Sequence, residues 1–238
     1  MDRSTALHRL TDTVAHLYRQ WDTPDSSGAS ALKQCTIALE REAGTQGTLI
    51  ARTVGEQLGW PVFDHELLDI IAREMGLPVH DLENIDERPI SWFLEAVEAF
   101  TTEHFVSENA LVKYLVKTVL TLGSRGGCII VGRGAAQILP PETTLRVRLV
   151  APLKARIKTV SENPGLIWQD AENRVKRMDQ ERTQFVQQYF NRDPNHAANY
   201  DLVLNTERFA PEDCAWSIGA GLRALQARVS ANPVAQLS

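Results

Sequence analysis

Residues 35–59 have the sequence CTIALEREAGTQGTLIARTVGEQLG and divide into three parts. Residues 35–39 form a short apolar run, which is typical of a strand buried on both faces of a parallel sheet. The loop of residues 40–47 follows, and residues 48–58 then carry apolar side chains at helical spacing, up to the helix-ending signal Gly59. This order of strand, glycine-containing loop and helix predicts the first unit of an α/β fold.

The same alternation continues along the rest of the chain. Further strands are predicted over residues 60–63, 127–132, 144–150 and 200–205. Helices are predicted over most of residues 64–123, and over residues 152–162 and 210–229. Residues 168–190 are predicted to form one long polar helix or a pair of helices. Strands separated by helices imply a parallel sheet with right-handed crossovers, and such sheets bind ligands at the carboxyl ends of their strands.

The two ends of the chain differ in character. Residues 4–21 have the spacing of an amphipathic helix, and residues 22–30 have the composition of a linker. The sequence therefore suggests an N-terminal helix and linker, residues 1–33, and a main domain, residues 34–238. The helix would either pack on this domain or contact a second subunit or another partner, and the residues alone leave both options open.

Composition excludes several classes of protein. The chain has 238 residues, 43% of them hydrophobic and 23% charged, and a net charge of −5, which is ordinary for a globular protein. It shows no membrane-spanning run, no secretory signal and no zinc-type cysteine spacing. We expect a cytoplasmic protein without a membrane partner. The acidic balance also argues against binding to a nucleic acid polymer.

Three segments are expected at the ligand-binding edge of the sheet. The first is the loop of residues 41–48, whose glycines and helix start suit a bound phosphate, although they fit a simple turn and helix cap equally well. The second is Arg133, which stands between two glycines after an apolar strand and could instead pair with the acidic residues 56–108. The third is a basic helix over residues 168–190, either a lid or a solvated face.

These segments belong to a wider set of motifs. The set consists of TIALEREAGTQGTLIA (36–51), VFDHELL (62–68), CIIVGRGAAQIL (128–139), LRVRLVAP (145–152), RMDQERTQFVQQYF (177–190) and NYDLVLNT (199–206). In this order and spacing, they resemble the cytidylate-kinase-like family of P-loop nucleoside monophosphate kinases. The resemblance implies an α/β, three-layer P-loop kinase fold with a five-stranded parallel sheet of order 2-3-1-4-5. It also implies a helical acceptor-binding insertion, residues 64–125, and a lid, residues 164–196.

The resemblance also implies roles for individual residues. The phosphates of ATP, bound with Mg²⁺, would lie on Gly44, Thr45, Gln46, Gly47 and Thr48. The acceptor, with CMP or dCMP as the first choice, would contact Asp64, Arg133 and Asp193. The catalytic cations would be Arg41, Arg177, Arg182 and Arg192.

Three positions depart from the pattern of well-known cytidylate kinases. Gln46 stands where those enzymes have a lysine, so Arg41 or a lid arginine would have to supply the positive charge. Gly134 replaces an aspartate and His196 replaces an arginine, which leaves the base preference open. Two alternatives therefore remain: a catalytically degenerate nucleotide-binding regulatory module, and a kinase of another small phosphate acceptor.

Overall fold

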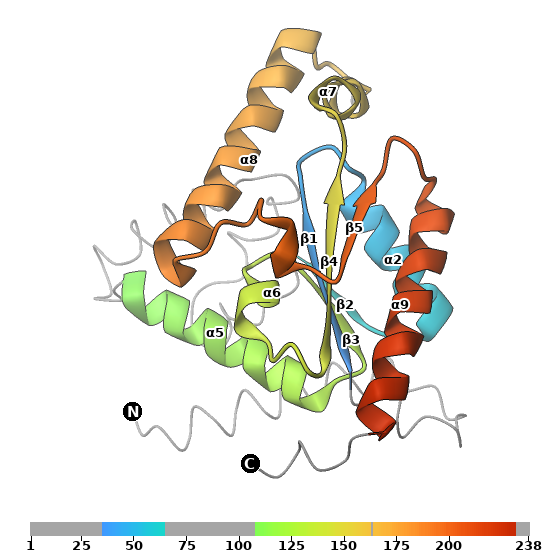
Figure 1. The fold of residues 1–238 in the computed structure, drawn as a ribbon. Helices are drawn as coiled ribbons and strands as arrows, with labels where there is room; N and C mark the ends of the chain where they lie inside the picture. The colour runs from blue at the N-terminus through green and yellow to red at the C-terminus, as the bar shows by residue number, and fades with distance from the viewer. Residues whose placement is uncertain (1–34, 65–107, 163, 232–238) are drawn as a thin grey trace.

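A computed structural model describes residues 35–64, 108–162 and 164–231 of the chain. These residues contain one sheet of five parallel strands in the order β2-β3-β1-β4-β5 (Figure 1). The strands are β1 (Thr36–Arg41), β2 (Val62–Phe63), β3 (Cys128–Val131), β4 (Thr144–Val150) and β5 (Leu202–Asn205). The predicted α/β class and strand order are confirmed.

Helices cover both faces of this sheet, which makes three layers (Figure 1). One face carries α2 (Gly47–Leu58) and α9 (Pro211–Ala231). The other carries α5 (Glu108–Arg125), α6 (Ala135–Ile138) and the C-terminal part of α8 (Trp168–Phe190). The remaining elements are α7 (Leu153–Ser161), which precedes α8, and the short 3₁₀ helix η3 (Ala197–Asn199), which precedes β5.

Strand β1 lies at the centre of the sheet and takes part in both cores. Ile37 and Leu39 are fully buried among residues of α2 and α9. Ala38, whose side chain points to the opposite face, packs with Ile130 and Phe185. Burial on both faces explains why the sequence of this strand is a nearly continuous apolar run.

The strand continues two residues further than its apolar run. The loop was predicted to begin at Glu40, but Glu40 and Arg41 pair with Arg148 and Leu149 of β4. A charged side chain can occupy the end of a buried strand when its neighbours compensate the charge, and the apolar pattern does not reveal this. The predicted strand over residues 60–63 is shorter, Val62–Phe63, and residues 168–190 form one continuous helix.

Part of the predicted organisation falls on residues that are not described. These are the N-terminal helix over residues 4–21 and most of the helical insertion after Asp64. Within the described ranges, no helix is both long and apolar enough to cross a membrane.

Candidate functional site

The loop between β1 and α2 lies at the carboxyl edge of the sheet. Two of its residues have left-handed backbone conformations, Gly44 with φ of 81° and Gln46 with φ of 55°. A Cβ atom on Gly44 would lie 2.5 Å from the backbone oxygen of Arg156, so only glycine fits against α7 at this point. The loop therefore has a tight backbone path that ends at the amino terminus of α2.

Side chains from α7 and α8 hold this loop in place. The backbone N–H of Ala43 donates to Asp179 Oδ1 at 2.8 Å, and Arg156 Nη1 donates to the Ala43 carbonyl at 3.1 Å. Arg156 also pairs with Asp179, which closes a three-residue network. Within the loop, Thr45 Oγ1 donates to the Glu42 carbonyl at 2.8 Å. The loop is thus braced by residues that follow it by more than a hundred positions.

Three side chains meet where α2 begins. Arg41 Nη2 donates to both carboxylate oxygens of Asp64, at 2.9 and 3.1 Å, and Thr48 Oγ1 donates to Asp64 Oδ2 at 2.7 Å. Burial raises the pKa of Asp64, but attraction to Arg41 and the hydrogen bond from Thr48 outweigh burial, so the pKa lies below its usual value. Asp64 is therefore ionised at neutral pH, and it links β2 to the helix start.

Arg133 follows β3 in a strained conformation. Gly132, Arg133 and Gly134 all have positive φ, of 70°, 59° and 71°. A non-glycine residue in this region costs about 1–3 kcal/mol, and such strain is common at functional sites. Burial lowers the pKa of Arg133 to about 10, with repulsion from Arg41 acting in the same direction and attraction to Asp64 opposing both. This turn directs a charged guanidinium toward Arg41 and Asp64 at the edge of the sheet.

Arg182 reaches the same region from α8. Its Nη1 donates to the Arg41 carbonyl at 3.0 Å. Burial lowers the pKa of Arg182 to about 9, and repulsion from Arg41 and Arg133 adds to the effect. Three guanidinium groups from β1, the β3 turn and α8 are therefore close enough to repel one another. A bound anion would relieve this repulsion.

The other predicted arginines, Asp193 and Gln46 are exposed. Arg177 lies on the outer side of α8, with a side chain that is 63% exposed and 3.9 Å from Glu181. Arg192 is exposed, and the exposed carboxylate of Asp193 accepts a hydrogen bond from the backbone N–H of Asn195 at 2.9 Å. Gln46 is exposed at the N-cap of α2. Of the predicted catalytic arginines, Arg41 and Arg182 lie at the loop and are joined by a hydrogen bond.

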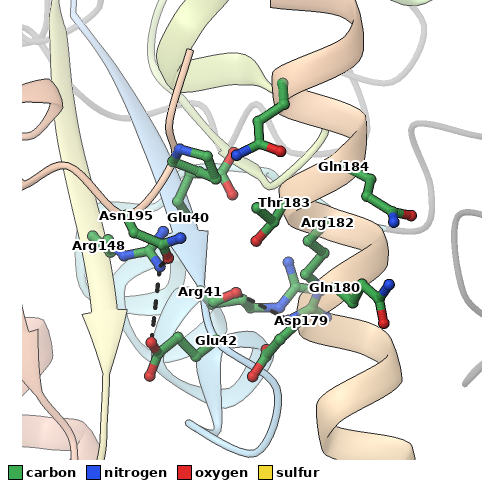
Figure 2. Close-up of a pocket in the computed structure, with 12 residues that line it drawn as sticks. Glu40, Arg41, Glu42, Arg148, Asp179, Gln180, Arg182, Thr183, Gln184 and Asn195 are labelled. Atoms are coloured by element: carbon green, nitrogen blue, oxygen red, sulfur yellow. Dashed lines mark hydrogen bonds and ion pairs between the residues drawn. The ribbon is translucent and has the colours of Figure 1, made fainter.

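A polar cavity of about 430 Å³ lies beside the arginines, between α8 and the ends of β1 and β4 (Figure 2). Its walls include Glu40, Arg148, Asp179 and Asn195, none of which the sequence analysis identified. Glu40 and Arg148 sit within strands, where charged residues are rare, and this was an unused signal. Asp179 and Arg156 lie in polar helices and gave no such signal.

Two curated proteins match part of the chain. It is 30% identical over 97 residues to a cytidylate kinase from Methanopyrus kandleri, and this match covers 37% of this chain and 50% of that protein. It is 28% identical over 104 residues to a uronate isomerase from Corynebacterium glutamicum, and this match covers 43% of this chain and 20% of that protein. The chain thus spans half or less of the length of each of these relatives.

One solved structure has a similar fold along nearly its whole length. It is an uncharacterized protein from Eubacterium ventriosum, with 23% identity and a TM-score of 0.56, and the match covers 82% of this chain and 99% of the other. A model of the cytidylate kinase-like family matches residues 36–208, which include all five strands, the braced loop and the three converging arginines. The chain is therefore a member of the cytidylate kinase-like family.

Proposed function

We propose that the protein transfers the terminal phosphoryl group of ATP to a nucleoside monophosphate, with CMP or dCMP as the first acceptor to test. Its family supports nucleotide-dependent phosphoryl transfer in general. The observation that carries the proposal is the convergence of Arg41, Arg133 and Arg182 beside the loop before α2. Such a cluster matches a reaction in which phosphates of two substrates meet.

Phosphoryl transfer requires alignment of the substrates and compensation of negative charge, with little covalent chemistry by the protein. In this proposal, backbone N–H groups at the start of α2 bind the donor phosphates, which is favoured at a helix amino terminus. Arg133 orients the acceptor phosphate. Arg182 lies between the loop and the lid helix and faces the transferring group. No side chain has to act as a general base, because the acceptor phosphate is already an anion.

The residues present also suit Mg²⁺. This ion is usually held by one or two carboxylates, by hydroxyls and by substrate phosphates. The Thr48 hydroxyl and the Asp64 carboxylate are hydrogen-bonded to each other at the start of α2, and both are oxygen donors of the required kind. When bound, Mg²⁺ would neutralise part of the charge on the donor phosphates.

The missing lysine can be compensated by arginines that are already in place. Gln46 is uncharged, and the neighbouring cation Arg41 is committed to Asp64 through two hydrogen bonds. Arg182 has no such bidentate carboxylate partner among the contacts described above, and it reaches the same loop through the Arg41 carbonyl. We therefore assign the compensating charge to Arg182 first and to Arg41 second.

A second candidate function is nucleotide binding without catalysis, as a regulatory module. The observation that favours it is the hydrogen bond from the Ala43 N–H to Asp179, since a carboxylate occupies a loop amide that phosphate could otherwise use. Gln46 in the lysine position is consistent with the same function.

One assay separates these functions. The full chain is incubated with ATP, Mg²⁺ and each of CMP, dCMP, UMP, AMP and a set of non-nucleotide phosphate esters, and ADP formation is followed with ³¹P detection of the second product. Turnover with CMP or dCMP supports the proposal. Absence of turnover with every acceptor, combined with measurable binding of ATP or CMP, would overturn it and favour the regulatory module. Turnover only with a non-nucleotide acceptor would reassign the substrate.

A further inference from the structure

Glu40 is a buried carboxylate with an unsatisfied oxygen. It is only 7% exposed, near the carboxyl end of the central strand β1. The backbone N–H of Gly134 donates a hydrogen bond to this carboxylate. Its Oε1 atom, however, is fully buried and has no hydrogen-bond partner among the described residues. An acceptor in this state is costly to maintain and normally has a partner in the functional form of a protein.

The neighbouring arginine does not supply that partner. Arg148 is the register partner of Glu40 on β4, so both side chains are on the same face of the sheet. Its Nη2 instead donates to Asn195 Oδ1 at 2.7 Å, and its Nη1 donates to the Tyr200 hydroxyl at 3.4 Å. The guanidinium also lies 5.5 Å from the centre of the Tyr200 ring. Arg148 is thus held away from Glu40 by other contacts.

Glu40 forms part of the wall of the cavity under α8 (Figure 2). Its Oε1 atom is closed off in this conformation, so a ligand in the cavity reaches that oxygen only when the carboxylate turns toward it. The helix lines this cavity with hydroxyl and amide side chains at a spacing of three or four residues, namely Gln180, Thr183, Gln184 and Gln187. Arg182, from the same helix, lies between them and points toward β1 (Figure 2). The cavity therefore offers hydrogen-bonding groups on several sides, and its lining includes the guanidinium groups of Arg41, Arg148 and Arg182.

These groups limit the chemistry of a ligand. A metal cation at Glu40 would lie among the positive charges of Arg41, Arg148 and Arg182. An inorganic anion without hydroxyl groups, such as sulfate, could bind the arginines but would not satisfy Glu40, since it carries no donor and would be repelled. A molecule that carries a phosphate and several hydroxyl groups satisfies both requirements, because it places an anion on the arginines and a donor at Glu40.

We infer that Glu40 accepts a hydrogen bond from a ring hydroxyl of a phosphorylated, polyhydroxylated ligand, and thereby determines which phosphate esters the cavity admits. The ligand chemistry is that of a pentose phosphate, either free or as the ribose phosphate of a nucleotide. The inference rests on the proposed function, because the arginines must hold the phosphate, and it adds a specificity-determining residue to that site.

Binding experiments with the full chain test this role without relying on turnover. Affinities are measured by titration calorimetry for inorganic phosphate, ribose 5-phosphate, CMP and 2′,3′-dideoxy-CMP. We expect at least one hydroxylated ligand to bind at least about tenfold more tightly than its counterpart without ring hydroxyls. This ratio corresponds to the free energy of a hydrogen bond to a charged group. Preference for CMP over dideoxy-CMP identifies a nucleotide as the source, whereas preference for ribose 5-phosphate over phosphate alone identifies a free sugar phosphate.

Three variants then assign the preference to Glu40. Glu40→Gln keeps the shape of the side chain and removes its charge. Glu40→Asp keeps the charge on a side chain that is one methylene shorter. Both should reduce the preference for hydroxylated ligands to about threefold or less, while the affinity for inorganic phosphate stays equal or increases. The matched control is Glu142→Gln, an exposed glutamate beside the opposite end of β4, which should retain the preference.

The outcomes separate this inference from the proposed function. A hydroxyl preference that survives in Glu40→Gln would overturn the inference. Equal affinities of the wild type for all phosphate ligands would also overturn it, and this result is expected if Oε1 stays closed off from the cavity. Neither result would affect the proposed function. Failure of the wild type to bind any of these ligands would overturn both.

Discussion

Arg182 is the side chain that joins the lid helix to the phosphate loop, since it extends from α8 and donates to the carbonyl of Arg41. Its guanidinium is kept charged in a half-buried site beside two other arginines. In the proposed reaction, a cation in this position would compensate the charge that develops on the transferring phosphoryl group. Its contribution should therefore appear in the turnover number more than in the binding of either substrate.

Replacement of Arg182 by alanine should lower the turnover number by about a thousandfold, the lower end of the effect of such an arginine in other phosphoryl-transfer enzymes. Steady-state assays of ADP formation measure it. The control is Lys176→Ala, which removes a cation from the exposed side of the same helix and should change turnover less than about twofold. Equal losses in the two variants would show that the effect comes from the overall charge of α8.

Glu40 should impose a measurable cost on stability. Burial raises the pKa of its carboxyl above the ordinary value of a glutamate, and attraction to Arg41, Arg182 and Arg148 only partly offsets burial. A carboxyl with a raised folded-state pKa destabilises the fold increasingly as the pH rises through that pKa, and has no such effect below the pKa of the unfolded chain.

We therefore expect Glu40→Gln to have a higher free energy of unfolding than the wild type at about pH 8, with the difference shrinking toward zero near pH 4. Urea denaturation at several pH values measures it. A difference that is independent of pH, or that favours the wild type at the higher pH, would contradict the raised pKa.

At the scale of elements, the loop is stabilised from outside by α7 and α8. Gly44 is the point of closest approach, because its hypothetical Cβ would lie 2.5 Å from the Arg156 backbone oxygen. Gly59, at the C-terminal end of α2, has a similar positive φ, but a Cβ there would meet nothing within 4 Å. A substitution at Gly59 therefore tests backbone strain alone, whereas one at Gly44 tests backbone strain together with a steric clash.

Gly44→Ala should destabilise the protein by about 2–4 kcal/mol, from strain and overpacking together. Gly59→Ala should cost only about 1 kcal/mol, from the left-handed conformation alone. Urea denaturation of both variants measures the difference. If the two substitutions lower the free energy of unfolding equally, the close contact between the loop and α7 does not contribute to stability.

The link between α8 and the loop makes a separate prediction. Asp179 accepts the N–H of Ala43 and pairs with the buried Arg156. Asp179→Asn therefore removes one of the two carboxylates that face this arginine and leaves it paired with Glu42 alone. This should lower the free energy of unfolding by about 1–3 kcal/mol. Asp170→Asn, an exposed change in the first turn of the same helix, should cost no more than about 1 kcal/mol. Similar costs for both variants would argue against a specific brace.

For the molecule as a whole, ligand binding should be visible as a gain in stability. Mg²⁺ and ATP at a hundred times their dissociation constant should add about 2.7 kcal/mol to the free energy of unfolding, which raises Tm by roughly 5–11 °C in a protein of this size. Differential scanning fluorimetry measures the shift. Adenosine, which lacks phosphates, should give a much smaller shift at the same concentration, and an equal shift would contradict binding through the loop.

Much of the architecture could be predicted from the order of short patterns along the chain. The apolar runs at β1, β3 and β4, each followed by helical spacing, indicate a parallel sheet, and the structure has that sheet in the expected order. The loop before α2 and Arg133 could also be recognised locally, because glycine positions and a lone arginine after an apolar strand are visible in the sequence itself.

The composition of the site could be predicted only in part. Arg41 and Arg182 are joined by a hydrogen bond, whereas the side chain of Arg177 is exposed on α8 and Arg192 and Asp193 are exposed residues after that helix. Sequence spacing in a polar helix does not show which side faces the sheet, because α8 carries charged or polar residues almost all around.

The sequence by itself determined the succession of buried strands and helices, since backbone periodicity and glycine punctuation act over a few neighbouring residues. Only the tertiary structure decided that Glu40 is buried without a partner for one oxygen and that Asp179 and Arg156 brace Ala43. These contacts depend on strand register and on helix rotation, and they join residues more than a hundred positions apart. Such contacts are set by packing of the whole domain. A charged residue at the end of an apolar strand can be seen in the sequence, but its partners cannot.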